Sequence, residues 1–160
     1  MFSDINDMVR ELTRIFAECG IVFQVVENFA GAPVQGFIKK DNNKIILSMT
    51  IRGAYADIFW FSLFHEIGHL LNGDIGDSNF VDFTNSNSDM EQLADKFARQ
   101  TLIAEDAFTN FMKRQNLTEI DIVKFAKQQN VQPFIVVGRI QKGKDNFKLF
   151  SNLKVKYKWK

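Results

Sequence analysis

Apolar residues near the start of the chain recur at spacings of three and four, which is the period of an amphipathic helix. This pattern predicts a helix over residues 4–19 that ends at Gly20. Short β-branched and aromatic runs follow, and a turn cluster at residues 41–43 separates two of them. We therefore expect a strand over 21–27 and a β-hairpin formed by residues 37–40 and 44–48.

The pattern then changes to longer apolar segments with helical spacing. Residues 57–71 are strongly apolar and are followed by Asn72 and Gly73, which predicts a central buried helix with a glycine stop. A polar loop over 73–88 precedes a second helix, expected over 89–104. The residues expected to face inward on that helix are Leu93, Ala94, Phe97, Ala98, Leu102 and Ile103.

The last third of the chain predicts a helical body and a strand. Two shorter helices are expected near 105–114 and 118–129, and a further helix begins at Pro133, a residue suited to the first helical position. The tail over 153–160 alternates strictly between apolar residues and lysine, which predicts an edge strand. The fold class is therefore α+β, with a small sheet packed on a helical body around a central helix.

Composition agrees with one ordinary globular domain. The chain has 160 residues, of which 46% are hydrophobic and 24% charged, and this balance excludes disordered and fibrous classes. We interpret residues 1–160 as a single domain, because no linker or repeat is visible. The single cysteine, Cys19, excludes a disulfide framework and fits a reducing compartment. No signal peptide or membrane span is visible, so we expect a soluble, cytoplasmic protein without a membrane partner.

Basic residues are concentrated near the C-terminus. Residues 138–160 hold eight basic residues against one acid, a net charge of +7, while the rest of the chain holds twelve against 18 acids, a net charge of −6. Such a tail can meet a nucleic acid or an acidic partner, or its lysines can line a solvated edge. Residues 118–141 also have helix-turn-helix rhythm, so a DNA-binding regulator remains an alternative. The apolar run 134–137 argues against it, because a recognition helix needs polar side chains there.

The strongest chemical signal is an HExxH motif, residues 65–69, on the predicted central helix. Four residues of helix return nearly to the same face, so His65 and His69 can share one metal ion. Glu66 beside them can accept a proton from a metal-activated water. Burying these groups without partners would cost several kcal/mol, which a metal would remove. The alternative is a pair of core histidines satisfied by backbone carbonyls.

A catalytic zinc needs three protein ligands, and the chain has no third histidine. Glu91 is the favoured third ligand, because Glu91 and Asp95 lie four residues apart on one face of the next predicted helix. Asp95 would then accept the free ring N–H of a ligand histidine. In another interpretation, Glu91 closes a capping box with Ser88. The rival ligands are the loop aspartates Asp74, Asp77 and Asp82.

The two motifs together resemble the ImmA/IrrE family of metallopeptidases. Residues 65–72 read His-Glu-Ile-Gly-His-Leu-Leu-Asn and residues 91–98 read Glu-Gln-Leu-Ala-Asp-Lys-Phe-Ala, which match the family's HEIGH and E-x-x-A-N/D-x-F-A motifs. The similarity covers roughly residues 45–160. It implies a compact zincin-like, gluzincin-type fold, with zinc on His65, His69 and Glu91, Glu66 as the base, and Asp95 behind the ligands.

Family members with known roles cleave or inactivate DNA-binding repressors of phages, mobile elements and stress regulons, and others belong to toxin–antitoxin-like loci. The resemblance therefore implies a zinc endopeptidase that acts in transcription regulation on a repressor or a toxin–antitoxin partner. Fused members carry a helix-turn-helix domain before the peptidase, whereas the motif begins at residue 65 here, so we expect a stand-alone form. Residues 102–107 also lack the proline that follows the family's second motif.

Several features of the site stay open at the level of sequence. The oxyanion of peptide hydrolysis needs a donor, and Tyr55, Arg139 and Tyr157 are candidates by residue type. Manganese or iron could occupy the same ligand set as zinc. A zinc-bound module that captures a repressor or toxin without cleaving it is a further alternative. The presence of Glu66 favours the enzyme, since a structural zinc needs no base.

Overall fold

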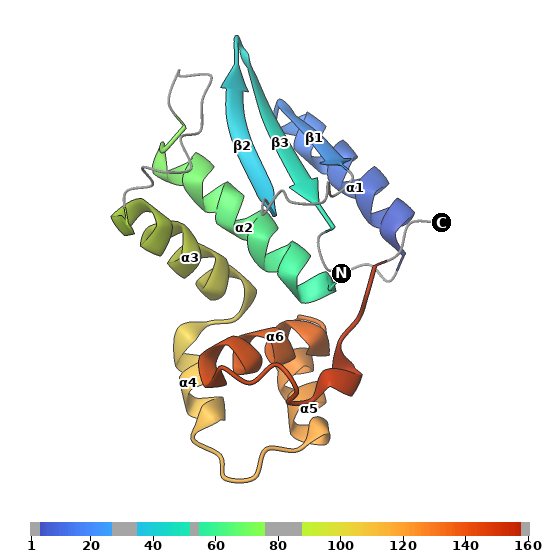
Figure 1. Cartoon of the computed structure of the whole chain (residues 1–160), viewed down its shortest axis with the longest axis vertical. Helices are drawn as coiled ribbons and strands as arrows, with labels where there is room; N and C mark the ends of the chain where they lie inside the picture. Colours follow the sequence, from blue (N-terminus) through green and yellow to red (C-terminus); the bar gives the residue numbers. More distant parts are fainter. Residues whose placement is uncertain (1–3, 27–34, 52–54, 76–87, 158–160) are drawn as a thin grey trace.

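The computed structural model describes residues 4–26, 35–51, 55–75 and 88–157 (Figure 1). Within these residues the chain forms six α-helices, a three-stranded mixed sheet and one 3-10 turn, which confirms the α+β class. The elements in chain order are α1 (Ile5–Glu18), β1 (Ile21–Val26), β2 (Gly36–Asp41), β3 (Lys44–Thr50), α2 (Ala56–Asn72), α3 (Ser88–Leu102), α4 (Glu105–Met112), α5 (Glu119–Gln128), α6 (Pro133–Lys144) and η2 (Ser151–Leu153).

The sheet is built around β3, in the order β1-β3-β2. β2 and β3 form the predicted hairpin, in which Asp41 pairs with Lys44 across the turn. Asn42 has a φ of 53°, the left-handed conformation that tight hairpin turns favour. β1 pairs with the other edge of β3 in parallel, with Ile21 opposite Ile45.

Both α1 and α2 cover the same face of the sheet. The register places Phe23 and Ile38 opposite Leu47, so these buried side chains share one face. On this face Phe16 of α1 stacks against Phe23 with ring centroids 5.1 Å apart, and α2 packs on β2 and β3. Val22 on the other face remains 43% exposed. The sheet therefore supplies α2 with one continuous apolar support.

Helix α2 is the central element of the fold, as the sequence predicts. It packs against β2, β3, α3 and α6, and Phe59, Trp60 and Leu63 are buried along it. Figure 1 shows α3 beside α2 on the side away from the sheet, with α4, α5 and α6 grouped toward the amino-terminal end of α2. The predicted glycine stop is also present, since Gly73 has a φ of 76°. No helix in the described residues is long and apolar enough to cross a membrane.

The predicted edge strand over 153–160 is not formed by the described part of the tail, and its last three residues lie outside that part. Lys156 makes an isolated bridge to Tyr55, and the Val155 carbonyl accepts the first backbone N–H of α2 at 2.9 Å. Tyr157 is buried in the core. The tail therefore caps the amino-terminal end of α2. Its backbone accepts a hydrogen bond from an N–H group that has no partner within the helix, and burial of Tyr157 in the core holds it there instead of in a sheet.

Small residues bring α3 close to α2. Ala94, Ala98 and Leu102 are buried as predicted, and they recur every four residues along one narrow face of α3. The prediction that Leu93 faces inward is wrong, because this side chain is 53% exposed. Leu93 lies about 100° around the helix from Ala94, and the narrow face buried against α2 does not extend that far.

Gly68→Ala tests the closeness of this packing. A Cβ at Gly68 would lie 3.0 Å from the Cα of Ala94, a backbone atom that cannot rotate away. Alanine ordinarily stabilises a helix interior by about 0.5–1 kcal/mol relative to glycine, but overpacking costs about 1–3 kcal/mol. We expect a lower free energy of unfolding in urea. Gly143→Ala in α6 is the control, since a Cβ there meets no heavy atom within 4 Å. Equal stabilisation by both substitutions would contradict the tight helix contact.

Candidate metal centre

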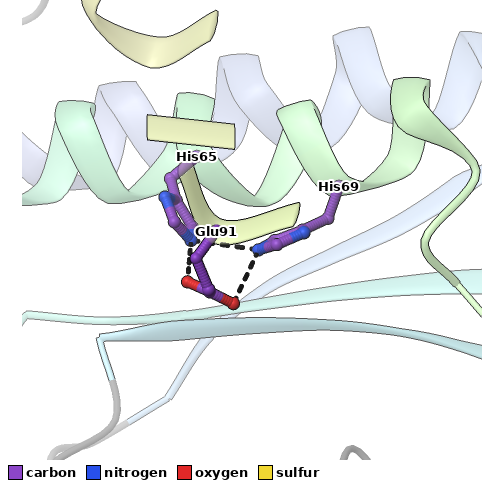
Figure 2. Close-up of side chains that lie close together, drawn as sticks. All are labelled: His65, His69 and Glu91. Atoms are coloured by element: carbon purple, nitrogen blue, oxygen red, sulfur yellow. Dashed lines mark hydrogen bonds and ion pairs between the residues drawn. The ribbon is translucent and has the colours of Figure 1, made fainter. Parts of the chain in front are cut away.

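The two histidines of the motif meet on one face of α2. His65 and His69 are separated by one helical turn, and their Nε2 atoms lie 3.0 Å apart (Figure 2). Their rings are nearly perpendicular, at 81°. Both side chains are largely buried, 21% and 16% exposed. This geometry directs two nitrogen lone pairs toward one point.

Glu91 on α3 completes the group. Its Oε2 lies 3.2 Å from His65 Nε2, and its Oε1 lies 3.4 Å from His69 Nε2. One donor atom from each residue falls within 4.8 Å of the others, and Figure 2 shows the carboxylate directed at both rings. In a tetrahedral zinc site with bonds of about 2.0–2.1 Å, neighbouring ligand atoms stand roughly 3.3 Å apart. The donor set and its spacing therefore fit a metal ion of this kind.

The other ring nitrogens are held by carboxylates. His65 Nδ1 lies 3.0 Å from Asp95 Oδ1, and His69 Nδ1 lies 3.0 Å from Asp74 Oδ2. Each carboxylate can accept the Nδ1–H of its histidine, which leaves the Nε2 atom as the lone-pair donor. The structure thus brings Asp95 to the ring edge of His65 that points away from Glu91.

Asp74, a rival ligand in the sequence interpretation, lies behind His69 instead. Gly73 ends α2 in the left-handed region, and the Asp74 N–H then donates to the His69 carbonyl at 3.0 Å. This turn brings the Asp74 side chain back to the Nδ1 edge of the ring. The other rivals, Asp77 and Asp82, lie outside the described residues, as does the Ser88 side chain of the possible capping box.

Glu66 lies beside the cluster in a poorly solvated position. Burial raises the pKa of its carboxyl to about 7, and the negative charge of Glu91 acts in the same direction. His69 and a backbone hydrogen bond from Ile38 of β2 lower the pKa and only partly offset the burial. A Cβ at Gly36 of β2 would lie 3.2 Å from Glu66 Cγ. The edge strand β2 therefore packs directly on this glutamate.

A cleft of about 970 Å³ runs from the cluster along α2. Its α2 wall repeats every helical turn, with Ile58, then Phe61 and Ser62, then His65 and Glu66. The opposite wall comes from α3, α4 and α6, and it is built from aromatic, basic and acidic side chains. The lining residues from these helices and the loop after α6 are Glu91, Asp95, Ala98, Arg99, Glu105, Phe108, Gly138, Arg139, Lys142, Gly143 and Phe147.

The three oxyanion candidates from sequence are otherwise engaged. Tyr157 OH accepts a hydrogen bond from the Trp60 indole at 2.9 Å, and burial raises the pKa of this phenol. The Tyr55 ring lies 4.7 Å from the ammonium groups of Lys154 and of Lys156. Neither tyrosine lines the cleft.

Arg139 does line the cleft, but its guanidinium has structural partners. It donates to the carbonyl of Ile103 at 2.7 Å, pairs with Glu105, and lies 4.1 Å from the centroid of the Phe108 ring. These contacts close the end of α3 against α4. These contacts indicate that Arg139 links α6 to α4 and to the end of α3, and that it is not placed to stabilise an oxyanion.

The helix-turn-helix interpretation meets a difficulty in α6. Phe134, Ile135, Val136 and Val137, which begin this helix, are all buried. A recognition helix presents its amino-terminal residues to the base edges of DNA. Burial of that end leaves only the last turn of α6 available to a partner, which disfavours groove recognition by this segment.

Sequence reasoning missed two features of the cleft. One is the buried ion pair between Asp57 of α2 and Lys154 of the tail. The other is the approach of Arg99 and Lys142 to Asp95, each at 3.6 Å. The spacing of four between Asp95 and Arg99 is visible in the sequence. The remaining partners come from distant segments that only the fold brings together.

Comparison of the chain with models of known protein families, and with curated proteins, finds no match.

Proposed function

We propose that this protein is a zinc-dependent endopeptidase that uses the HExxH helix α2 as its catalytic element. The observation that carries this proposal is the convergence of His65, His69 and Glu91 at ligand spacing, with His65 and Glu91 on the wall of a large cleft. Two histidines and one carboxylate match the ligand set of catalytic zinc sites, which keep a fourth position for water or substrate. Manganese and iron can use the same donors, so metal analysis is part of the test.

A bound zinc supplies Lewis acidity, which makes water more acidic and polarises the carbonyl of the scissile peptide. Glu66 lies next to the ligands and accepts the proton of the attacking water, then returns it to the departing amine nitrogen. Asp95 and Asp74 hold the imidazoles of His65 and His69 in the orientation that presents Nε2. The cleft holds the substrate chain along α2, next to the ligands.

The substrate in this proposal is a regulatory protein, either a helix-turn-helix repressor or a toxin–antitoxin-type partner. This part rests on the resemblance of the two motifs to ImmA/IrrE metallopeptidases. The cleft volume of about 970 Å³ is large enough to hold several side chains of a polypeptide substrate. An enzyme of this kind needs no DNA-binding domain in its own chain.

Metal content and chelation test the proposal. We expect near-stoichiometric zinc by mass spectrometry of the purified protein, and cleavage of a quenched fluorescent peptide library that stops with a chelator and returns with zinc. Absence of any bound metal would overturn the site. Bound zinc with no cleavage of the library or of candidate repressors would favour a non-catalytic binding module.

Asp74→Ala and Asp95→Ala should weaken zinc binding to a similar degree. Each removes a carboxylate that orients one histidine, and loss of such a partner typically costs about 10- to 100-fold in metal affinity. Competition with a fluorescent zinc chelator measures the change. A loss about tenfold or more larger in Asp74→Ala than in Asp95→Ala would indicate that Asp74 binds the metal directly.

A further inference from the structure

Three carboxylates of the cleft wall face cations, and they do so in different numbers. Asp57 pairs with Lys154, and Glu105 pairs with Arg139. Asp95 is different, because one carboxylate faces two cations, Arg99 and Lys142. The Asp95 corner of the cleft therefore carries one positive charge more than its own carboxylate neutralises.

The two cations come from different helices and approach the same oxygen. Arg99 of α3 and Lys142 of α6 each lie 3.6 Å from Asp95 Oδ2, while Oδ1 of Asp95 faces His65. A distance of 3.6 Å is outside the range of a hydrogen bond, which is about 2.7–3.2 Å. The directional N–H donors of both cations can therefore serve another acceptor.

A third cation, Arg139, lies near Arg99, although its own charge is paired with Glu105. Burial lowers the pKa of Arg139, and the neighbouring charge of Arg99 lowers it further, against the opposing effect of Glu105. Arg99 is thus near enough to Arg139 to repel it. An additional negative charge from a ligand would relieve this repulsion, because like charges in a partly desolvated cleft interact strongly.

Aromatic residues share the cleft wall with the cations. Phe61, Phe108 and Phe147 line the same cleft. Phe147 is 67% exposed, yet its backbone is fixed, because the buried Gln141 amide donates to the carbonyls of Phe147 at 3.0 Å and Leu149 at 2.6 Å. A rigid loop that presents an exposed aromatic ring at a cleft provides a preorganised apolar contact.

We propose that the cleft selects polypeptide segments with an acidic side chain, whose carboxylate is received between Arg99 and Lys142. This inference rests on the proposed function and adds a substrate class to it. The Asp95 carboxylate and the His65 imidazole stand between the cations and the proposed metal position. At about 3.3 Å per residue of extended chain, the acidic residue therefore lies roughly two to three residues from the scissile bond. Apolar residues near it contact the aromatic wall.

The observations favour a polypeptide over a nucleic acid. Both could supply an anion, but these cations lie on the wall of a cleft that is mainly apolar and that leads to the metal ligands. Sequence-independent nucleic-acid binding uses basic groups spread along a phosphate backbone. The test therefore includes a duplex as a competing ligand.

Peptide binding tests the inference in the zinc-loaded Glu66→Gln protein, which would leave the peptide intact. The probe is a fluorescein-labelled, amidated octapeptide of alanine, leucine and phenylalanine with one central glutamate, compared with its glutamine counterpart by fluorescence anisotropy. We expect the glutamate peptide to bind about three- to tenfold more tightly, as charge-assisted contacts allow. Arg99→Gln and Lys142→Gln should reduce this preference below twofold. Lys127→Gln, which removes an exposed charge from α5 outside the cleft, should retain it.

Each outcome decides one point. Equal binding of the two peptides, or a preference that survives both substitutions, overturns the inference. If a glutamine peptide with a free C-terminal carboxylate binds as tightly as the amidated glutamate peptide, the cations bind a chain terminus, and the side-chain preference is overturned. Displacement of the peptide by a random 20-base-pair duplex at lower concentration would assign them to nucleic acid. The same anisotropy assay on metal-stripped protein separates the two proposals. If the protein binds no zinc and cleaves no peptide but still prefers the glutamate peptide, the peptidase proposal fails and the acidic preference stands.

Discussion

Replacing Glu91 with alanine should remove stoichiometric zinc from the protein. Glu91 is the sole member of the cluster that α3 contributes, and its oxygens lie 3.2 and 3.4 Å from the two histidine nitrogens. Structural zinc sites with four ligands bind with about 10–16 kcal/mol, so one ligand corresponds to roughly 3 kcal/mol. We therefore expect zinc affinity to fall by about two to three orders of magnitude. Mass spectrometry after dialysis, followed by competition with a zinc chelator, measures the loss.

The fold should tolerate this substitution. The Glu91 side chain is 44% exposed, and alanine favours a helix more than glutamate does. A thermal melt of the metal-free protein should therefore match that of metal-free wild type. Asp89→Ala is the matched control, because it removes a carboxylate from the same turn of α3 and Asp89 is not one of the three clustered residues. Full zinc retention in Glu91→Ala would contradict the assignment and move the third ligand to Asp77 or Asp82.

Local pattern was sufficient to predict the elements that carry the site. The HExxH motif could be placed on a helix because the apolar run over 57–71 is long and is followed by Gly73, a residue that commonly ends helices. The observed α2 begins and ends within one residue of that prediction. Glu91 and Asp95 could be paired from their spacing alone, since residues four apart share a helical face. The structure places both beside the histidines, Glu91 at Nε2 and Asp95 at Nδ1.

Features that depend on tertiary contacts could not be predicted in the same way. The position of Asp74 is set by the left-handed turn at Gly73, so its sequence neighbourhood alone allowed a ligand as well as a partner of His69. The tail alternates like a strand, but its backbone satisfies the open end of α2 instead. Lys142 reaches Asp95 only because α6 packs on α2, and no local periodicity encodes that approach.

Glu66→Gln should keep zinc and lose hydrolysis. Glutamine preserves the size of the side chain and removes the group that accepts the proton of water. Loss of a general base typically lowers the rate by about 10²- to 10⁴-fold. Because Glu66 is not among the three clustered ligand residues, zinc content should stay near that of wild type. Cleavage of the peptide library at a fixed zinc concentration, with metal content measured on the same sample, provides both readouts.

Glu119→Gln is the control for this substitution, since it makes the same chemical change on α5, outside the cleft. It should retain both zinc and activity. The pair of readouts separates the roles that the motif combines, because a ligand change lowers zinc and activity together, whereas a base change lowers activity alone. Unaltered hydrolysis in Glu66→Gln would assign proton transfer to another group. Hydrolysis that is lost together with zinc would show that Glu66 supports the metal, and would leave the base of the reaction to be found among the other acidic residues of the cleft.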